Sequence, residues 1–385
     1  MTGPDPGASP SADAPPRVSV VMAVFDGEKY VAESVASILA QDFPDFELII
    51  IDDGSTDGTR DIVAAFDDPR IVLHANPANI GLAASLNRGL GVARGEFIAR
   101  QDADDVSAPT RLARQVEFMD AHPDIGLLGT AHTEIDDAGA VVGDVDAHAD
   151  HAMIAWSLLF FCPFVHSSVM FRRSVVDGVG AYDPAWRYSL DFEYWTRIAR
   201  RYRVANLPER LVRLRFHVDS MTSTYGERTL EGHRLRVRNV ARLLGMDGRP
   251  DAEQEAVHAR IARLMFGPWT GLDAGDALTT VDEVLHLQTA FVRDAGLQRD
   301  EAAAHRFELR RHLGRALLEF GRSTPAPSAA PRLAWRIAGL TGRDMLRPRT
   351  LAALADLLLR GTLLQPVARA AGRFRRGRHG DRTGA

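Results

Sequence analysis

The first hundred residues alternate apolar strand-like runs with helical segments, and this alternation restricts the fold more than any other feature. The runs are VSVVMAV (18–24), FELIIID (46–52), RIVLHAN (70–76) and GEFIAR (95–100), and helical patterns lie between them at 28–41, 60–66 and 80–93. Runs with little polar alternation are typical of strands buried on both faces. The order strand–helix–strand predicts an α/β domain with a mostly parallel central sheet.

Further elements follow the fourth run. The sequence predicts a helix at 110–122, a strand at 125–130, a hairpin turn near 137–139, a helix at 190–201 and a strand–turn–strand unit at 202–217. The segment SSVMFRRSVV (167–176) mixes apolar and basic residues and favours no single element. From about residue 225 the pattern is helical, so we expect a helical C-terminal region after the α/β domain.

The chain divides into five predicted regions. Residues 1–16, rich in Pro, Ser, Ala and Gly, are expected to form a disordered tail. The α/β domain occupies 17–222, the helical region 223–322, a linker 323–332, and the C-terminal helices with a basic tail 333–385. The start lacks the pattern of a secretory signal, and no run of 18 apolar residues predicts a transmembrane helix, so we expect a cytoplasmic protein.

Composition excludes several classes of function. Cys162 is the only cysteine, so a disulfide framework cannot form and a cysteine-based zinc site is not expected. The formal net charge is −5, which provides no general positive field to attract nucleic acid. We therefore expect no nucleic-acid partner.

Aspartates follow three of the predicted strands, and Asp26 comes just after the first. Asp52 and Asp53 follow the second strand, and Asp102, Asp104 and Asp105 crowd into four positions after the fourth. Ligands of open parallel α/β sheets bind beyond the carboxyl ends of the strands, so this crevice is acidic. It lacks the glycine-rich dinucleotide fingerprint and the phosphate-cradling loop. A Mg²⁺ or Mn²⁺ ion between carboxylates and a phosphate would explain it, although Asp-x-Asp pairs are also common on solvated turns.

In combination these motifs resemble the family 2 glycosyltransferases of the GT-A fold. The resemblance covers roughly residues 17–220, and it rests on the opening strand, the DDGS turn at 52–55, the GEFIA strand and the DADD turn at 102–105, in that order. It implies a GT-A catalytic domain. It also implies transfer of a sugar from a nucleotide-diphospho-sugar to an acceptor hydroxyl, with inversion at the anomeric carbon.

The resemblance implies a donor site at the strand ends. Asp53 would hydrogen-bond the donor base, and a UDP-sugar is the favoured donor. The backbone around Ala23, Val24 and Phe25 would line the same pocket. Arg100 would either neutralise its acidic neighbours or contact phosphate.

The same resemblance implies a metal site. Asp104 would ligate the Mg²⁺ or Mn²⁺ ion that bridges the diphosphate, Asp102 would lie by the donor ribose or the metal, and His217 would approach the metal. Asp105 would either position its neighbours or cap the next segment, and capping is the preferred interpretation. His166 matches a frequent histidine of the family, with no role that the sequence predicts.

A catalytic base is implied at the start of a later helix. In YSLDFEYW (188–195), Asp191 matches the base, while Leu190 replaces the acid that usually precedes it and Glu193 is the competing carboxylate. A position near a helix N-terminus favours the ionised form of a carboxylate. Trp195, four residues further on, would stack on an acceptor sugar or pack in the core.

The implied acceptor is a saccharide or a lipid-linked saccharide in cell-envelope or extracellular polysaccharide synthesis. An apolar segment at 351–364 precedes five arginines, which are Arg369, Arg373, Arg375, Arg376 and Arg378. This order is typical of peripheral binding to anionic lipid, here at the inner face of the plasma membrane. A packed terminal helix with a solvated basic tail would give the same pattern.

Other functions fit parts of the pattern. A phosphoacceptor signalling module needs a lysine beyond its acceptor aspartate, and the only lysine is Lys29. A nucleotidyltransferase would have a glycine-rich loop with Arg or Lys after the first strand, which AVFDGEKY (23–30) does not supply. A sugar-nucleotide-binding protein that has lost catalysis is the remaining alternative.

Overall fold

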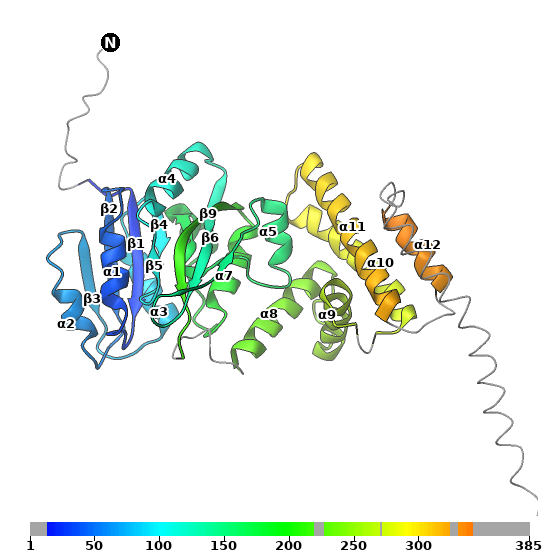
Figure 1. Ribbon diagram of the computed structural model, residues 1–385, viewed down its shortest axis with the longest axis horizontal. Coiled ribbons are helices and arrows are strands. Elements are labelled where there is room, and N and C mark those ends of the chain that lie inside the picture. Colours follow the sequence, from blue (N-terminus) through cyan, green and yellow to red (C-terminus); the bar gives the residue numbers. More distant parts are fainter. Residues whose placement is uncertain (1–13, 219–226, 270–271, 324–329, 342–385) are drawn as a thin grey trace, which may run out of the picture. The chain divides into compact units, whose positions relative to one another are not determined.

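The computed structural model describes residues 14–218, 227–269, 272–323 and 330–341 (Figure 1). These residues form two compact units, and the division falls between Arg236 and Val237, inside helix α8 (Glu227–Leu243). Several predictions lie wholly or largely outside the described residues: most of the N-terminal tail, the domain boundary at 222, the middle of the linker, and the apolar segment with its basic tail.

A nine-stranded mixed sheet forms the centre of the first unit. Its order is β3-β2-β1-β4-β8-β6-β9-β5, with β7 beside β6. The strands from β3 to β4 are parallel, β8 is antiparallel to both its neighbours, and β6 and β9 are parallel. The predicted α/β fold class with a mostly parallel sheet is confirmed. The strands are β1 (Val18–Val24), β2 (Phe46–Asp52), β3 (Ile71–Ala75), β4 (Phe97–Arg100), β5 (Val106–Ser107), β6 (Ile125–Ile135), β7 (Val141–Val145), β8 (Met170–Arg172) and β9 (Arg203–Arg215).

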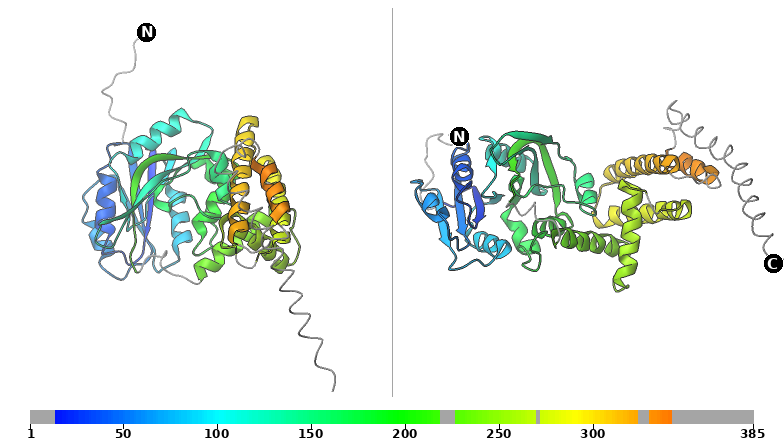
Figure 2. Two further views of the ribbon diagram at one scale, coloured as in Figure 1. Left: turned by 45° about the vertical axis from the view of Figure 1, so that its right-hand side comes forward. Right: turned by 60° about the horizontal axis from the view of Figure 1, so that its bottom comes forward.

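Helices cover both faces of this sheet (Figures 1 and 2). One face packs against α1 (Val31–Leu39), α2 (Thr59–Ala64) and α4 (Arg111–Ala121). The other packs against α3 (Leu82–Val92), α5 (His151–Ser157), α6 (Arg173–Val179) and α7 (Leu190–Ala199). Strand side chains alternate between faces, so Val20 and Met22 of β1 enter the first core and Val21 and Ala23 the second. This two-sided burial explains why the strand sequences are almost continuously apolar.

The sequence predicts the regular elements well and the irregular ones poorly. Strands β1 and β2 have the predicted bounds, and the hairpin turn lies where predicted, with Gly139 at a φ of 85°. The segment without a clear prediction contains a short 3₁₀ turn (His166–Ser168), β8 and the first part of α6.

The prediction of a strand–turn–strand unit over 202–217 is wrong. Strand β9 is continuous through Pro208, and it absorbs its extra residues as a bulge. On one side of this bulge Leu207 lies opposite Thr130, and on the other Val212 lies opposite His132. A bulge lets a strand take up unpaired residues without ending the ladder.

The second unit is helical in its described residues. After the end of α8 come α9 (Asp251–Phe266), α10 (Ala274–Asp294), α11 (Arg299–Ser323) and α12 (Ala330–Thr341). The predicted linker at 323–332 overlaps the end of α11 and the beginning of α12, so its outer residues are helical. Among the described residues, no helix combines the length and apolar character needed to cross a bilayer.

Two glycines of α3 allow a matched test of its packing on β1. A Cβ atom at Gly89 would lie 2.6 Å from Cγ1 of Val21, whereas one at Gly91 would meet no atom within 4 Å. Overpacking a core costs about 1–3 kcal/mol, while Gly→Ala in a helix gains up to about 1 kcal/mol. We expect Gly89→Ala to lower the midpoint of thermal unfolding and Gly91→Ala to raise it, measured by circular dichroism. A Gly89→Ala protein that unfolds at or above the Gly91→Ala midpoint would contradict this packing.

Candidate active site

The register of the parallel strands brings the predicted strand-end residues to one edge. Val24 lies opposite Asp52, and Val21 lies opposite Arg100. Just past the strands, the Asp53 N–H donates to the Val24 carbonyl at 2.8 Å. The loops that leave β1 and β2 therefore begin side by side, while the loop that leaves β4 begins earlier along the same edge, opposite Val21.

Asp53 is a buried carboxylate that joins two loops. It accepts hydrogen bonds from the Asn76 side chain at 2.7 Å and from the backbone N–H groups of Ile80 and Gly81, each at 2.9 Å. It thereby fixes the segment after β3 against the turn after β2. Asp57, further along the same loop, forms an Asx turn in which its carboxylate accepts the Thr59 N–H at 3.0 Å.

The loop after β1 presents one side chain and otherwise backbone. Ala23 and Val24 are buried, whereas Phe25 is 47% exposed. Asp26 has a φ of 47°, uncommon for a residue other than glycine, and its carboxylate accepts the Thr56 N–H at 2.8 Å. Of the three predicted pocket residues, Phe25 alone can offer its side chain to a ligand.

Arg100 is fully buried and pairs with Asp102. Its guanidinium also donates to the carbonyls of Val21 and Gln101 and to Nε2 of His166, the last at 3.0 Å. Burial raises the pKa of Asp102, but the charge of Arg100 and the hydrogen bonds from Ser167 and Arg100 together hold the pKa below its ordinary value. Arg100 therefore neutralises the negative charge of Asp102, which is the first of its two predicted roles. The predicted contact with the donor is corrected, because the side chain has no exposed surface.

Asp104 and His217 face each other. Nε2 of His217 lies 3.0 Å from Oδ2 of Asp104, and the Asp104 side chain is 30% exposed. The imidazole packs on the Tyr30 ring with 4.8 Å between centroids. Burial and the nearby charge of Asp102 raise the pKa of Asp104. A carboxylate and an imidazole thus meet in a place where negative charge is already crowded.

Asp105 holds neighbouring segments together and does not cap a helix. Its carboxylate accepts the Arg215 backbone N–H at 2.8 Å and the hydroxyl of Ser167, and it is 1% exposed. Helix α4 begins later, after Thr110. The preferred capping interpretation is therefore wrong, and the alternative, a positioning role, is what the contacts display. Burial and the charges of Asp104 and Asp102 raise the pKa of Asp105 well above its ordinary value.

A second buried arginine supports this turn from the core side. Arg111 of α4 is fully buried and donates to the side chains of Gln101, Ser107 and Gln115, at 2.9–3.1 Å. It also donates to the carbonyls of Arg100 and Val169, at 2.7 and 3.2 Å. All of its donors are directed to protein acceptors, so Arg111 fixes the backbone from which the aspartates project.

Asp191 and Glu193 lie in the first turn of α7, but their surroundings differ. Glu193 is buried and accepts Nε of Arg197 at both carboxylate oxygens, at 2.9 and 3.0 Å. Asp191 is partly exposed and acts electrostatically on Tyr182. Because Glu193 is committed to an ion pair, Asp191 is the better candidate for a base.

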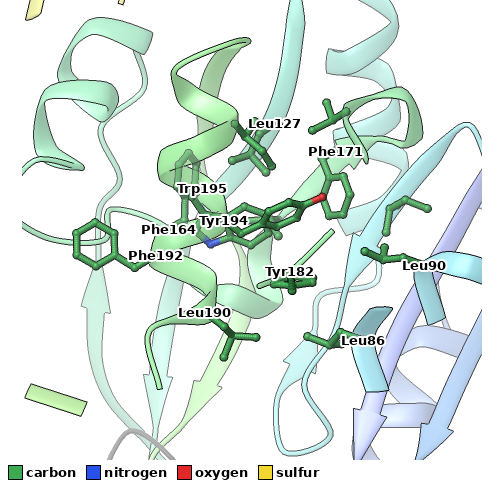
Figure 3. Packing of buried hydrophobic residues seen from close by; sticks show 14 of the residues in the cluster. Leu86, Leu90, Leu127, Phe164, Phe171, Tyr182, Leu190, Phe192, Tyr194 and Trp195 are labelled. Atoms are coloured by element: carbon green, nitrogen blue, oxygen red, sulfur yellow. The ribbon is translucent and has the colours of Figure 1, made fainter. Parts of the chain in front are cut away.

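Trp195 is a core residue. It is fully buried and packs among Phe164, Phe171, Tyr182 and Tyr194 (Figure 3). The suggested stacking on an acceptor sugar is therefore corrected, because no face of the ring is open.

His166 receives a position that the sequence does not predict. Its Nε2 accepts Arg100 Nε and lies 3.1 Å from the Tyr182 hydroxyl. Burial and the charge of Arg100 lower the pKa of His166 to about 3, so the ring is neutral and can accept. Tyr182, His166, Arg100 and Asp102 therefore form one buried polar chain leading to the site.

Sequence reasoning missed the groups that hold the aspartates. The Ser167 hydroxyl lies within hydrogen-bond distance of both the Asp102 and the Asp105 carboxylates, and Ser34 donates to the Asp102 carbonyl at 2.9 Å. Arg215 donates to the Asp104 carbonyl at 2.9 Å and pairs with Glu33 at 2.6 Å. The signal that could have found Ser167 is its place beside His166, in a segment with no clear element.

The donor set around Asp104 fits a divalent cation held partly by a ligand. Within the described ranges, no three His, Cys, Asp or Glu side chains are arranged to hold an ion by themselves. The Asp104 carboxylate and the His217 imidazole would supply part of a coordination sphere, as in sites where substrate phosphates and water complete it. A cation here would also offset the charge of Asp102, which together with burial raises the pKa of Asp104.

The chain is similar to glycosyltransferases in sequence and in fold. The model of glycosyl transferase family 2 matches residues 19–177. The putative glycosyltransferase EpsE of Bacillus subtilis is 37% identical over 211 residues, which are 53% of this chain and 75% of that protein. The succinoglycan biosynthesis protein ExoO of Rhizobium meliloti is 39% identical over 112 residues, 29% of this chain and 32% of that one. The structure of S. aureus TarS 1-349 with UDP-GlcNAc aligns over 92% of both chains, with a TM-score of 0.52 and 19% identity, which shows likeness of fold.

Arg111 and Arg114 of α4 allow a matched test of whether Arg111 supports the backbone of the DADD turn at 102–105. We expect Arg111→Met to lower the free energy of unfolding by about 3–5 kcal/mol, because it leaves several buried acceptors without donors. Arg114→Met, on the exposed side of the same helix, should cost less than about 1 kcal/mol. Urea unfolding followed by tryptophan fluorescence would measure both. Equal losses for the two variants would show that Arg111 does not support the turn.

Proposed function

Because this chain belongs to glycosyl transferase family 2, it is a glycosyltransferase, and we propose that it transfers a sugar from a nucleotide-diphospho-sugar with inversion. The proposal rests chiefly on Asp104, whose partly exposed carboxylate lies 3.0 Å from Nε2 of His217 beyond the end of β4. Asp53 and Phe25 lie at the same edge of the sheet, where they would contact the nucleotide of the donor. We further propose that the donor is a UDP-sugar.

Asp104 and His217, with Asp102 beside them, would hold a Mg²⁺ or Mn²⁺ ion. Such an ion, when bound, supplies positive charge where the diphosphate leaving group develops negative charge. Asp102 itself is oriented by Arg100 and Ser167. A fixed carboxylate avoids reorganisation during the reaction, which is the main contribution a protein makes to such electrostatic catalysis.

Asp191 would act as the general base. Its carboxylate takes the proton of the acceptor hydroxyl as the hydroxyl oxygen forms a bond to the anomeric carbon. The bond from that carbon to the diphosphate oxygen breaks on the opposite side, and the nucleoside diphosphate leaves with the electron pair. The start of α7 favours the charged form of Asp191 that this step needs.

We propose a saccharide or lipid-linked saccharide of polysaccharide synthesis as the acceptor. The name of the relative ExoO, a succinoglycan biosynthesis protein, supports this class. The C-terminal basic segment would bring the enzyme to an anionic membrane surface where such acceptors are found. The match to glycosyltransferases argues against the nucleotidyltransferase alternative.

Donor and metal should stabilise the protein together. In a thermal-shift screen of UDP-, GDP- and TDP-sugars, we expect a UDP-sugar with Mn²⁺ to raise the unfolding midpoint more than either alone. Saturation at a hundredfold excess over Kd adds about 2.7 kcal/mol, which is several degrees. Asp104→Asn should remove the metal-dependent part, whereas Asp144→Asn on β7 should keep it. The absence of any response to all three donor classes would refute the proposed function.

Removal of the base should separate catalysis from binding. We expect Asp191→Asn to lower the rate of nucleoside diphosphate release at least about 100-fold while donor affinity stays within about twofold. Asp177→Asn, an exposed change on α6, is the control. Unchanged turnover in Asp191→Asn would show that the base is another residue. A wild-type protein that binds the donor but releases no nucleoside diphosphate would favour the inactive sugar-nucleotide-binding alternative.

A further inference from the structure

We propose that Glu231 of α8 is a positioning residue for the reaction, because its carboxylate fixes the loop that leads into α7, the helix that carries Asp191. This inference rests on the proposed function of Asp191 as base. Glu231 lies in the first compact unit but outside residues 19–177, which match the family. The first turns of α8, which the sequence predicts to lie outside the catalytic domain, would therefore contribute to the reaction.

Three consecutive backbone N–H groups converge on this one carboxylate. Oε1 of Glu231 accepts the N–H of Arg187 at 3.1 Å. Oε2 accepts the N–H of Tyr188 at 2.7 Å and that of Ser189 at 3.0 Å. Such charge-assisted bonds are roughly twice as strong as neutral ones, and three of them leave the segment little freedom.

Helix α7 lacks the usual groups that would fix its start. The N-cap residue Ser189 makes no capping hydrogen bond with its side chain. In a capping box the third helical residue is Glu or Gln, which accepts the N–H of the N-cap, but here that residue is Phe192. Glu231 supplies the missing acceptor from another helix. The carboxylate that Asp191 carries stands only two positions after the N-cap.

The other end of the same loop is also held. The side chain of Asn87 on α3 donates to the Tyr182 carbonyl at 2.8 Å and accepts the Tyr182 N–H at 2.9 Å. The Tyr182 hydroxyl in turn reaches His166 at 3.1 Å. The loop between α6 and α7 is therefore anchored to the donor side at Tyr182 and to α8 at Ser189, and Glu231 sets where α7 begins.

The backbone of α8 lies close to the start of α7, as the proposed role of Glu231 requires. A Cβ atom added at Gly232 would lie 3.5 Å from Oγ of Ser189, so α8 passes directly over the start of α7. Leu235, one turn further along α8, is fully buried in the core that contains Trp195 and Tyr194. Packing thus holds the helix in place, while Glu231 supplies the directed contact.

The test compares Glu231→Gln and Glu231→Ala with Glu253→Gln, an exposed carboxylate change on α9. The glutamine keeps one acceptor oxygen but directs an amide donor toward an N–H, and the alanine removes every acceptor. Donor affinity and kcat are measured with the nucleotide sugar and Mn²⁺ that stabilise the wild-type protein most, following nucleoside diphosphate release. Hydrogen exchange at residues 187–189 is followed in parallel.

We expect kcat to fall about 10- to 100-fold in Glu231→Ala and less in Glu231→Gln, with donor Kd within twofold of wild type. Faster exchange at 187–189 should accompany the loss, and Glu253→Gln should behave as wild type. If kcat in Glu231→Ala stays within twofold of wild type, or falls only in parallel with donor affinity, the positioning role is overturned. Should Glu231→Ala fail to fold, the same criteria apply to Glu231→Gln. If Asp191→Asn retains wild-type turnover, the proposed base fails, whatever Glu231 does.

Discussion

Arg100 carries its charge fully buried at the end of β4, and the geometry of the site depends on how that charge is satisfied. A buried guanidinium is stable only when acceptors surround it. Here they are two carbonyls, the Asp102 carboxylate and the neutral ring of His166. Because His166 is neutral, it accepts from Arg100 without competing with Asp102 for its charge. The contact that neutralises one aspartate thereby links it to Tyr182 and to the loop before α7.

The three aspartates of the DADD turn differ in what balances their charge. Asp102 has Arg100, and Asp105 has the Ser167 hydroxyl and the Arg215 N–H. Asp104 has only His217 at hydrogen-bond distance in the contacts described above, and burial with the charge of Asp102 raises its pKa. The protein itself thus balances the charge of two carboxylates more fully than that of the third, which supports the proposal that Asp104 holds the cation.

The sequence predicts elements whose residues interact locally, and it misses roles that depend on distant contacts. Strands β1 and β2 were predictable because burial on both faces leaves a continuous apolar run. The role of Asp105 was not, since it depends on Arg215, 110 positions away. Arg111 belongs to a helix that reads as amphipathic, and its burial follows only from where α4 packs. Glu231 falls outside every motif, so its contact with 187–189 emerges only from the fold.

The bulge in β9 makes the number of residues in that strand more important than their chemistry. Before the bulge β9 pairs with β6 up to Leu207. After the bulge the pairing resumes, and Arg215 at the end of the strand contacts Glu33 and the Asp104 carbonyl. Side chains alternate along a strand, so one residue more or fewer there would turn the segment up to Arg215 over to the opposite face. Pro208 and Glu209 can therefore vary in type while their spacing must be kept. Homologues should tolerate substitutions at these positions far better than insertions or deletions.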